Sequence, residues 1–229
     1  MTQKNNIIIV GGGPAGLFCA YHLLKVGLSV DLYDHSSGLA KKFLIAGNGG
    51  LNLTHSEALD VFFTRYGKDE TLFKSLISDF TPNDLRNWCK ELDVATFVGT
   101  SGRVFPEKLN AAEILLNWSK RLKSFDNFNL FLKHRLVSIT KNKELTFQND
   151  EKKILVKSQN IILAMGGASW KKTGSDGLWK DIIKSLDIEF NEFLPMNCGF
   201  ERAWSEYFIS KVDRAPLKNI TISFNDMII

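Results

Sequence analysis

The sequence predicts an α/β fold with a parallel sheet, and three observations near its start carry the prediction. The run from Ile7 to Val10 is β-branched throughout, which is typical of a parallel strand buried on both faces. Apolar residues recur at helical spacing over 14–27, and a second apolar run covers 30–33. Strand, helix and strand in this order predict a βαβ unit whose two strands lie parallel.

The composition is that of one folded domain with a small addition. Of the 229 residues, 44% are hydrophobic and 24% are charged, which excludes disorder, collagen and coiled coil. No apolar run reaches the roughly 20 residues of a membrane helix, and the first apolar run stops at a glycine. We therefore expect no membrane partner and no signal peptide, and we expect a cytoplasmic location.

The charge and the cysteines indicate which partners and which redox compartment to expect. The formal net charge is +4, and the basic pairs at 152–153 and 171–172 are short, which favours a solvated surface over a nucleic-acid partner. Cys19, Cys89 and Cys198 lie far apart, and no C-x-x-C is present. The sequence thus predicts no disulfide framework and no metal site, and the thiols are those of a reducing compartment.

The turn between the first strand and the helix carries the pattern G-x-G-x-x-G. Gly11 permits a tight turn, Gly13 lets main chain approach a pyrophosphate, and Gly16 lets the helix pack closely. Asp34 follows at the end of the second strand, where a carboxylate can accept a ribose hydroxyl; Asp31 competes for this role from inside the strand. The pattern predicts a dinucleotide-binding Rossmann-like domain, without separating FAD from NAD.

A long glycine-rich loop over 35–56 then stands where a nicotinamide dehydrogenase would begin another helix. Long loops of this kind inside compact domains are usually functional. Lys42 can meet a phosphate or an anionic flavin edge, and the turn at 47–50 lets main chain approach a flat ring. Asn52 and Thr54 add polar groups. We interpret the segment as a second cofactor loop.

This loop resembles that of the BaiN/YhiN-type family of NAD(P)/FAD-dependent oxidoreductases. The matching residues are Lys42, the turn at 47–50, Asn52 and Thr54. Many members read G-G-R-C-N here, whereas residues 50–55 of this chain are similar to a subgroup reading G-L-N-L-T-H. The turn lacks the Arg and the Cys. The resemblance implies a two-dinucleotide-fold flavoprotein.

The middle of the chain predicts helices followed by short strands. Residues 57–93 read as helical, with Thr81 as an N-cap, and Asn110 caps a further helix. Residues 102–106 are similar to a G-R-x-F-P element of the family. Five short apolar runs then predict a small antiparallel β-meander that leads back to a parallel strand: 128–132, 136–139, 145–147, 154–156 and 161–163.

A strand ending in A-x-G-G, at 164–167, is the second strong motif. It resembles the A-T-G element of flavoproteins, and residues 168–177 continue the family's pattern. Pro195 to Phe200 resemble the entry into the family's inserted β-rich domain. We therefore divide the chain into a FAD-binding Rossmann-like domain at 1–190 and the start of a β-rich insertion at 191–229.

These observations together predict an FAD-dependent oxidoreductase that performs flavin hydride transfer. The resemblance implies NAD(P)H as donor and leaves the substrate undefined. His55 is the candidate general base, since histidine titrates near neutral pH and this one lies in the cofactor loop. The predicted cofactor-binding residues come from the two glycine motifs, the loop and one backbone position implied by resemblance: Gly11, Gly13, Pro14, Ala15, Gly16, Asp34, Lys42, Asn48, Gly49, Asn52, Thr54, Leu136, Ala164, Gly166 and Gly167.

Several alternatives stay open at this point. A non-catalytic FAD-binding or redox-sensing module would carry the same motifs, and an NAD-linked dehydrogenase would share the first βαβ unit. A tRNA-modifying flavoprotein is a more distant option. Because the chain stops in an apolar run at 227–229, we interpret it as an N-terminal fragment or a shortened member. We expect an exposed apolar surface where a C-terminal half, or a second copy, packs.

Overall fold

The computed structural model describes residues 6–47, 50–174, 176–194, 202–212, 221, 223–224 and 227–228. The chain forms two compact units, 1–193 and 194–229. All the features that bear on function below belong to the first unit.

A parallel sheet of four strands forms the centre of the first unit, in the order β10-β1-β2-β6. The strands are β1 (Ile7–Val10), β2 (Val30–Tyr33), β6 (Phe128–Phe131) and β10 (Ile161–Leu163). Each neighbouring pair is parallel. This confirms the predicted parallel sheet, and it corrects one assignment. Residues 128–132 were expected in the antiparallel meander, but the strand pairs with β2, because the preceding helix returns the chain to the start of the sheet.

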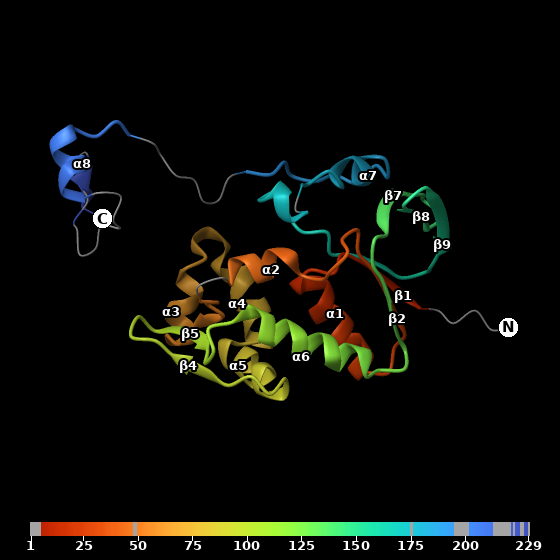
Figure 1. Ribbon diagram of the computed structural model, residues 1–229, viewed down its shortest axis with the longest axis horizontal. Helices are drawn as coiled ribbons and strands as arrows, with labels where there is room; N and C mark the ends of the chain where they lie inside the picture. Colours follow the sequence, from red (N-terminus) through yellow and green to blue (C-terminus); the bar gives the residue numbers. More distant parts are fainter. Residues whose placement is uncertain are drawn as a thin grey trace. The chain divides into compact units, whose positions relative to one another are not determined.

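Helices cover one face of this sheet. They are α1 (Pro14–Lys25) and α6 (Ala111–Lys123), which lie side by side (Figure 1). Helix α5 (Pro82–Glu91) packs against both of them, through contacts of Trp88 with aromatic side chains of α1 and α6. Leu17 and Leu24 of α1 pack with Ile114 and Trp118 of α6 over Ile9 of the sheet. Burial of each such side chain contributes about 1.5–3 kcal/mol, so this contact holds the βαβ unit to α6.

The N-termini of α5 and α6 are capped as the sequence predicts. Thr81 and Asp84 form a reciprocal capping box at α5. Asn110 Oδ1 accepts the N–H of Ala112 at 2.8 Å and so caps α6. Each cap satisfies backbone donors that the first helical turn leaves without a partner.

An antiparallel meander covers the other face. Its strands are β7 (Arg135–Ile139), β8 (Glu144–Asn149) and β9 (Lys152–Lys157), paired in sequence order. Leu145 and Phe147 of β8 are fully buried and pack against Ile8 and Tyr33. Helices cover one face of the central sheet and the meander covers the other, so the central strands are apolar on both faces.

A third, smaller sheet lies among the helices between β2 and α6. Its strands run in the order β3-β5-β4: Thr54–His55, Arg103–Pro106 and Thr96–Val98. The helices of this region are α2 (Lys41–Ala46), α3 (Leu59–Thr64) and α4 (Glu70–Asp79), with a 3-10 turn at Gly67–Asp69. The predicted helical stretch over 57–93 therefore contains three α-helices, α3, α4 and α5, which are joined by short turns.

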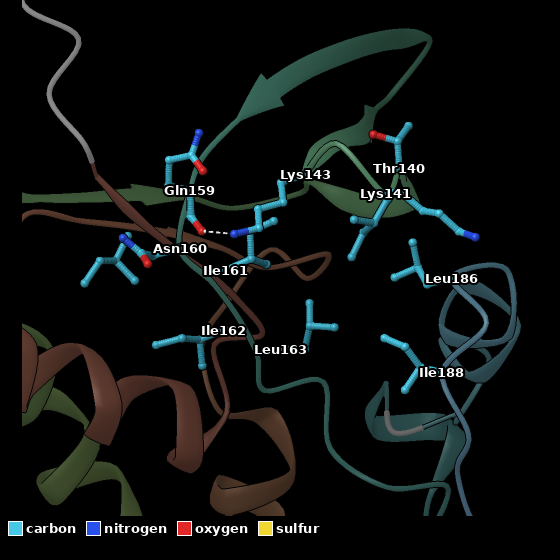
Figure 2. Close-up of a pocket in the computed structure, with 12 residues that line it drawn as sticks. Thr140, Lys141, Lys143, Gln159, Asn160, Ile161, Ile162, Leu163, Leu186 and Ile188 are labelled. Carbon is cyan, nitrogen blue, oxygen red and sulfur yellow. Dashed lines mark hydrogen bonds between the residues drawn. The ribbon is translucent and has the colours of Figure 1, made fainter.

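The outer edge of β10 has no strand partner among the described residues. An apolar groove of about 650 Å³ runs along it, toward the segment that follows α7 (Lys180–Lys184). Figure 2 shows Leu163 of this edge facing Leu186 and Ile188 across the groove. This groove is where we place the expected apolar surface, and its covering by a further segment or a second copy stays a prediction.

The second unit contains α8 (Glu206–Val212) and a two-stranded antiparallel ladder of β11 (Ser223–Phe224) and β12 (Met227–Ile228). Residues 195–200, where the resemblance placed the entry into an inserted domain, lie outside the described residues.

Candidate dinucleotide-binding groove

A groove of about 750 Å³ opens at the carboxyl ends of β1, β2 and β10. In open parallel sheets, ligands bind at this edge, because the strands end there and loops carry the functional groups. The groove brings together the glycine turn, the end of β2, α2, the start of β7 and the segment after β10. These parts are far apart in the sequence.

The glycine turn is built around three different steric requirements. Gly11 has φ +113°, and a Cβ there would lie 2.3 Å from the carbonyl oxygen of Ala164. A Cβ on Gly16 would lie 1.9 Å from the carbonyl oxygen of Gly11, so α1 begins in direct contact with the turn. A Cβ on Gly13 would meet nothing within 4 Å, because this residue faces the groove. Only two of the three glycines are therefore required by packing within the protein.

The N-terminus of α1 faces the same groove. Gly13 is the N-cap and supplies no side-chain hydrogen bond, and the first turn contains no acidic residue. Pro14 and Ala15, both predicted site residues, line the groove. Backbone N–H groups at a helix start carry partial positive charge, and with no side-chain cap they are available to an anion. A pyrophosphate fits this position.

Asp34 directly follows β2 and lines the groove with 8% of its surface exposed. Its carboxylate accepts the backbone N–H of Gly12 at 2.6 Å and that of Ser36 at 2.7 Å. Each carboxylate oxygen has a second lone pair, so a ribose hydroxyl can still bind. The competing Asp31 instead accepts hydrogen bonds from two asparagine side chains, at 2.9 and 2.8 Å, and does not line the groove.

The loop after β2 contributes α2 and two lysines. Lys41 and Lys42 line the groove, and the Nζ atom of Lys42 donates a hydrogen bond to Ser169 Oγ, 127 residues further along the chain. Within the described residues, neither lysine forms an ion pair with a carboxylate. Three carboxylates, including that of Asp181, also line the groove, so what the two lysines supply is positive charge that is not in direct contact with any of these acids.

The segment after β10 forms the opposite wall. Ala164, Gly166 and Gly167, which the sequence predicts to bind the cofactor, line the groove here. Gly166 has φ +74°, a conformation that favours glycine, and its carbonyl oxygen accepts the indole N–H of Trp179 at 2.9 Å. Trp179 thus serves to hold this wall in place, in addition to lining the groove.

The start of β7 closes the end of the groove beside β2. Leu136, the predicted backbone contact to adenine, lines the groove together with Arg135. Arg135 forms an ion pair with Asp176 across 3.8 Å, which links β7 to the segment after β10. An adenine ring placed near Asp34 would lie toward these residues.

Three other predicted residues do not line this groove. Asn52, Thr54 and His55 belong to the segment leading into and forming β3, which pairs with β5. The N–H of Glu57 donates to His55 Nδ1 at 3.2 Å, and Nε2 lies 3.0 Å from the carbonyl oxygen of Ser101. Both ring nitrogens are thereby engaged, so in this structure His55 holds its loop. Asn48 and Gly49 lie outside the described residues.

Several residues that line the groove were not predicted from the sequence. His35 and Ser36 follow directly after Asp34, and that position just beyond a parallel strand is the signal that could have found them. His134 precedes β7, and its Nδ1 lies 2.7 Å from the carbonyl oxygen of Leu132. No local pattern marks His134, because it reaches the groove through the pairing of β6 with β2.

The cysteines carry no nucleophilic site in the described part of the chain. Burial raises the pKa of the Cys89 thiol to about 11, and burial also raises the pKa of Cys19. A thiol with so high a pKa stays protonated and inert near neutral pH. Cys89 is fully buried in the core. The described residues also contain no cluster of metal-ligating side chains.

The fold and the groove together define a dinucleotide-binding protein of the Rossmann type. The model of the family "HI0933-like protein Rossmann domain" matches residues 5–199 of the chain. The chain therefore belongs to this family, and the resemblance read from the loop and the two glycine motifs is confirmed.

Two curated relatives share the matched region. The ribosomal RNA dihydrouridine synthase of Haemophilus influenzae is 27% identical over 196 residues, which are 82% of this chain and 47% of the relative. The Escherichia coli protein of the same name is 26% identical over 198 residues, 86% of this chain and 47% of the relative. The chain spans about half the length of the curated relatives it matches.

Solved structures share the fold at low sequence identity. Thermovibrio ammonificans THI4 superposes with a TM-score of 0.56 at 14% identity, covering 82% of this chain and 64% of that protein. A flavocytochrome c3 fumarate reductase gives 0.58 at 19% identity, covering 72% and 34%. These likenesses confirm the α/β fold with its parallel sheet. No helix in the described ranges is both long and apolar enough to cross a bilayer.

Proposed function

We propose that this chain is the FAD-binding part of an oxidoreductase. The observation that carries the proposal is one continuous groove with an α1 N-terminus, a buried carboxylate and two lysines. Membership of the HI0933-like family and the likeness to a flavocytochrome support the choice of FAD over a nicotinamide cofactor. When bound, the flavin supplies hydride transfer. The chain's own residues bind it, orient it and provide the charge around it.

Residues at different positions along the carboxyl edge of the sheet would bind different parts of FAD. The α1 N-terminus at Gly13 and Ala15 would hold the pyrophosphate. Asp34 would accept the adenosine ribose, with the adenine toward Leu136. The flavin would then extend the other way, over the end of β10. Strand order supports this direction, because β2 and β10 flank β1 on opposite sides.

Reduced nicotinamide is the donor that we propose for the flavin. The family resemblance supports it, and the sequence holds a single G-x-G-x-x-G, so the nicotinamide would bind transiently and not in a separate domain of this chain. Rapid mixing of the oxidised protein with NADH or NADPH tests this. Bleaching of the flavin bands by either one is expected, and a flavin that neither reduces would leave the donor proposal without support.

Cofactor release from the purified protein tests the central proposal. Heat-denatured protein should release one FAD per chain, identified by chromatography and mass spectrometry. A colourless protein that takes up only NAD would instead support the alternative of an NAD-linked dehydrogenase. A protein that binds FAD but is not reduced by NADH or NADPH would support the alternative of a non-catalytic FAD-binding or redox-sensing module.

A uridine base in ribosomal RNA is the substrate that the relatives' names favour. Both curated relatives are called ribosomal RNA dihydrouridine synthases, and each matches over more than four fifths of this chain. Saturation of the uracil ring requires a hydride and a proton, which a reduced flavin and one acidic group can supply. This candidate opposes the expectation of no nucleic-acid partner, which rested on a net charge of only +4.

Mass spectrometry of ribosomal RNA decides between those two expectations. Deletion of the gene in its native host should remove one dihydrouridine, a change of two mass units per base, from a single rRNA fragment. An unchanged dihydrouridine content would leave the substrate among small molecules. As a positive control, a purified relative named ribosomal RNA dihydrouridine synthase is incubated with rRNA that lacks dihydrouridine.

A further inference from the structure

One of the two groove lysines, Lys42, contacts the segment that follows β10. Lys42 reaches Ser169, which follows the wall segment Ala164 to Gly167. The strands β2, β1 and β10 are neighbours in that order, so an extended ligand that crosses their carboxyl ends passes β2 first, then β1, then β10. With the ribose at the end of β2 and the pyrophosphate at the end of β1, the flavin ring lies at the end of β10. This step rests on the proposed binding of FAD.

No carboxylate among the described residues forms an ion pair with Lys42. Its Nζ atom donates to a neutral hydroxyl, and none of the ion pairs in the described ranges involves it. The hydrogen bond to Ser169 fixes the ammonium group across the groove, between α2 and the wall after β10. Lys41 also lines the groove, but it makes no comparable hydrogen bond in the part of the chain described.

A fixed cation at this place acts differently on the two redox forms of a flavin. Acceptance of a hydride, two electrons and one proton, leaves the ring with one additional negative charge. A cation within a few ångströms favours an anionic group, by an amount that solvent exposure reduces. The oxidised ring carries no such charge and gains less.

We propose that Lys42, held by Ser169, binds the flavin ring and raises the reduction potential of the bound FAD. The lysine contacts the cofactor at its reacting end and not at its phosphates. Its neighbour Lys41 does not share this role. Ser169 acts as a positioning residue, because it orients the ammonium group without carrying charge.

Spectroelectrochemical titration of the FAD-loaded protein tests the proposal. In Lys42→Met, we expect the preference of the protein for reduced over oxidised FAD to fall about tenfold, which lowers the two-electron potential by about 30 mV. Lys42→Arg should retain most of the potential, because it keeps the charge. Lys41→Met removes the same charge from the same groove but no hydrogen bond to Ser169, so it should lower the potential less than Lys42→Met. Lys123→Met is the control that should leave the potential unchanged, because Lys123 is exposed on α6 and does not line the groove. Ser169→Ala should give a smaller decrease than Lys42→Met.

ADP provides the second measurement, because it contains the phosphates and ribose of FAD but no flavin. Affinity for ADP should be the same in the wild-type protein and in Lys42→Met. An equal loss of ADP and FAD affinity would assign the lysine to the phosphates and overturn the proposal. An unchanged potential in Lys42→Met, or an equal decrease in Lys41→Met, would also overturn it.

Loss of FAD from the variant does not prevent the comparison. Apoprotein can be titrated with oxidised FAD and with dithionite-reduced FAD, and the ratio of the two dissociation constants reports the same preference. A wild-type protein that binds no FAD would instead refute the proposed function itself. The two failures are therefore distinguishable.

Discussion

Two grooves border the same parallel sheet, and they carry different chemistry. Both grooves have apolar walls, but the groove at the strand ends also holds the start of α1, the Asp34 carboxylate and two lysines. The groove along the edge of β10 is lined by aliphatic side chains of the strand, such as Ile161 and Leu163, and by polar residues of the 140–143 turn and of 159–160. Their volumes are similar, about 750 and 650 Å³. Volume alone therefore does not distinguish a cofactor site from a packing surface.

The difference follows from the backbone. At the ends of the strands the hydrogen-bonded ladder stops, and turns and helix starts present free N–H groups and short polar side chains. Along an edge the strand continues, so the side chains are the same apolar ones that build the core. The strand-end groove is suited to a charged ligand, and the edge groove is suited to another apolar element.

Gly16→Ala should have the largest effect on this comparison. The new methyl group would lie 1.9 Å from the backbone oxygen of Gly11, so the glycine turn or α1 must shift. We expect a loss of about 3 kcal/mol in the free energy of unfolding, in the upper range for overpacking. Urea denaturation followed by circular dichroism measures it. Unchanged stability would mean that α1 does not begin in contact with the turn.

Asp34→Ala should come next, because it affects both stability and binding. The N–H groups of Gly12 and Ser36 would lose their acceptor, and each buried unsatisfied donor costs about 1–3 kcal/mol. FAD affinity, measured by fluorescence titration, should fall as well. Asp31→Ala is the control: it removes an acid from the same strand but should leave FAD affinity unchanged, since Asp31 does not line the groove.

Gly13→Ala should separate binding from folding. Its methyl group would meet no protein atom within 4 Å and would project into the groove where the pyrophosphate is proposed. We expect FAD affinity to fall about tenfold, equal to about 1.4 kcal/mol. The urea midpoint should stay close to that of the wild type. Wild-type affinity in this variant would place the phosphates elsewhere.

Leu163→Lys should have the smallest effect on the cofactor. The side chain is 37% exposed on the edge of β10, so the substitution should change stability by about 0.5 kcal/mol or less. FAD affinity should be unchanged. If the edge groove packs against a second copy, size-exclusion chromatography should show less self-association. A loss of FAD binding would contradict the separation of the two grooves.

The site could be predicted where its residues are local in the sequence. Gly11, Gly13, Asp34 and the A-x-G-G strand end were found because spacing within a βαβ unit dictates which groups reach the edge of the sheet. Lys42 was found by the composition of its loop. His134 was missed, because its position depends on β6 joining β2, a pairing that no local pattern encodes.

The sequence by itself determined the βαβ unit, its glycine turn, the helix caps and the parallel character of the sheet. These features follow from residue periodicity, backbone sterics and short-range hydrogen bonds. Only the tertiary structure decided that β6 and β10 flank the first two strands, that Lys42 meets Ser169, and that His55 holds a separate small sheet. The physical reason is that such contacts join segments far apart in the chain, and their geometry depends on how the whole core packs.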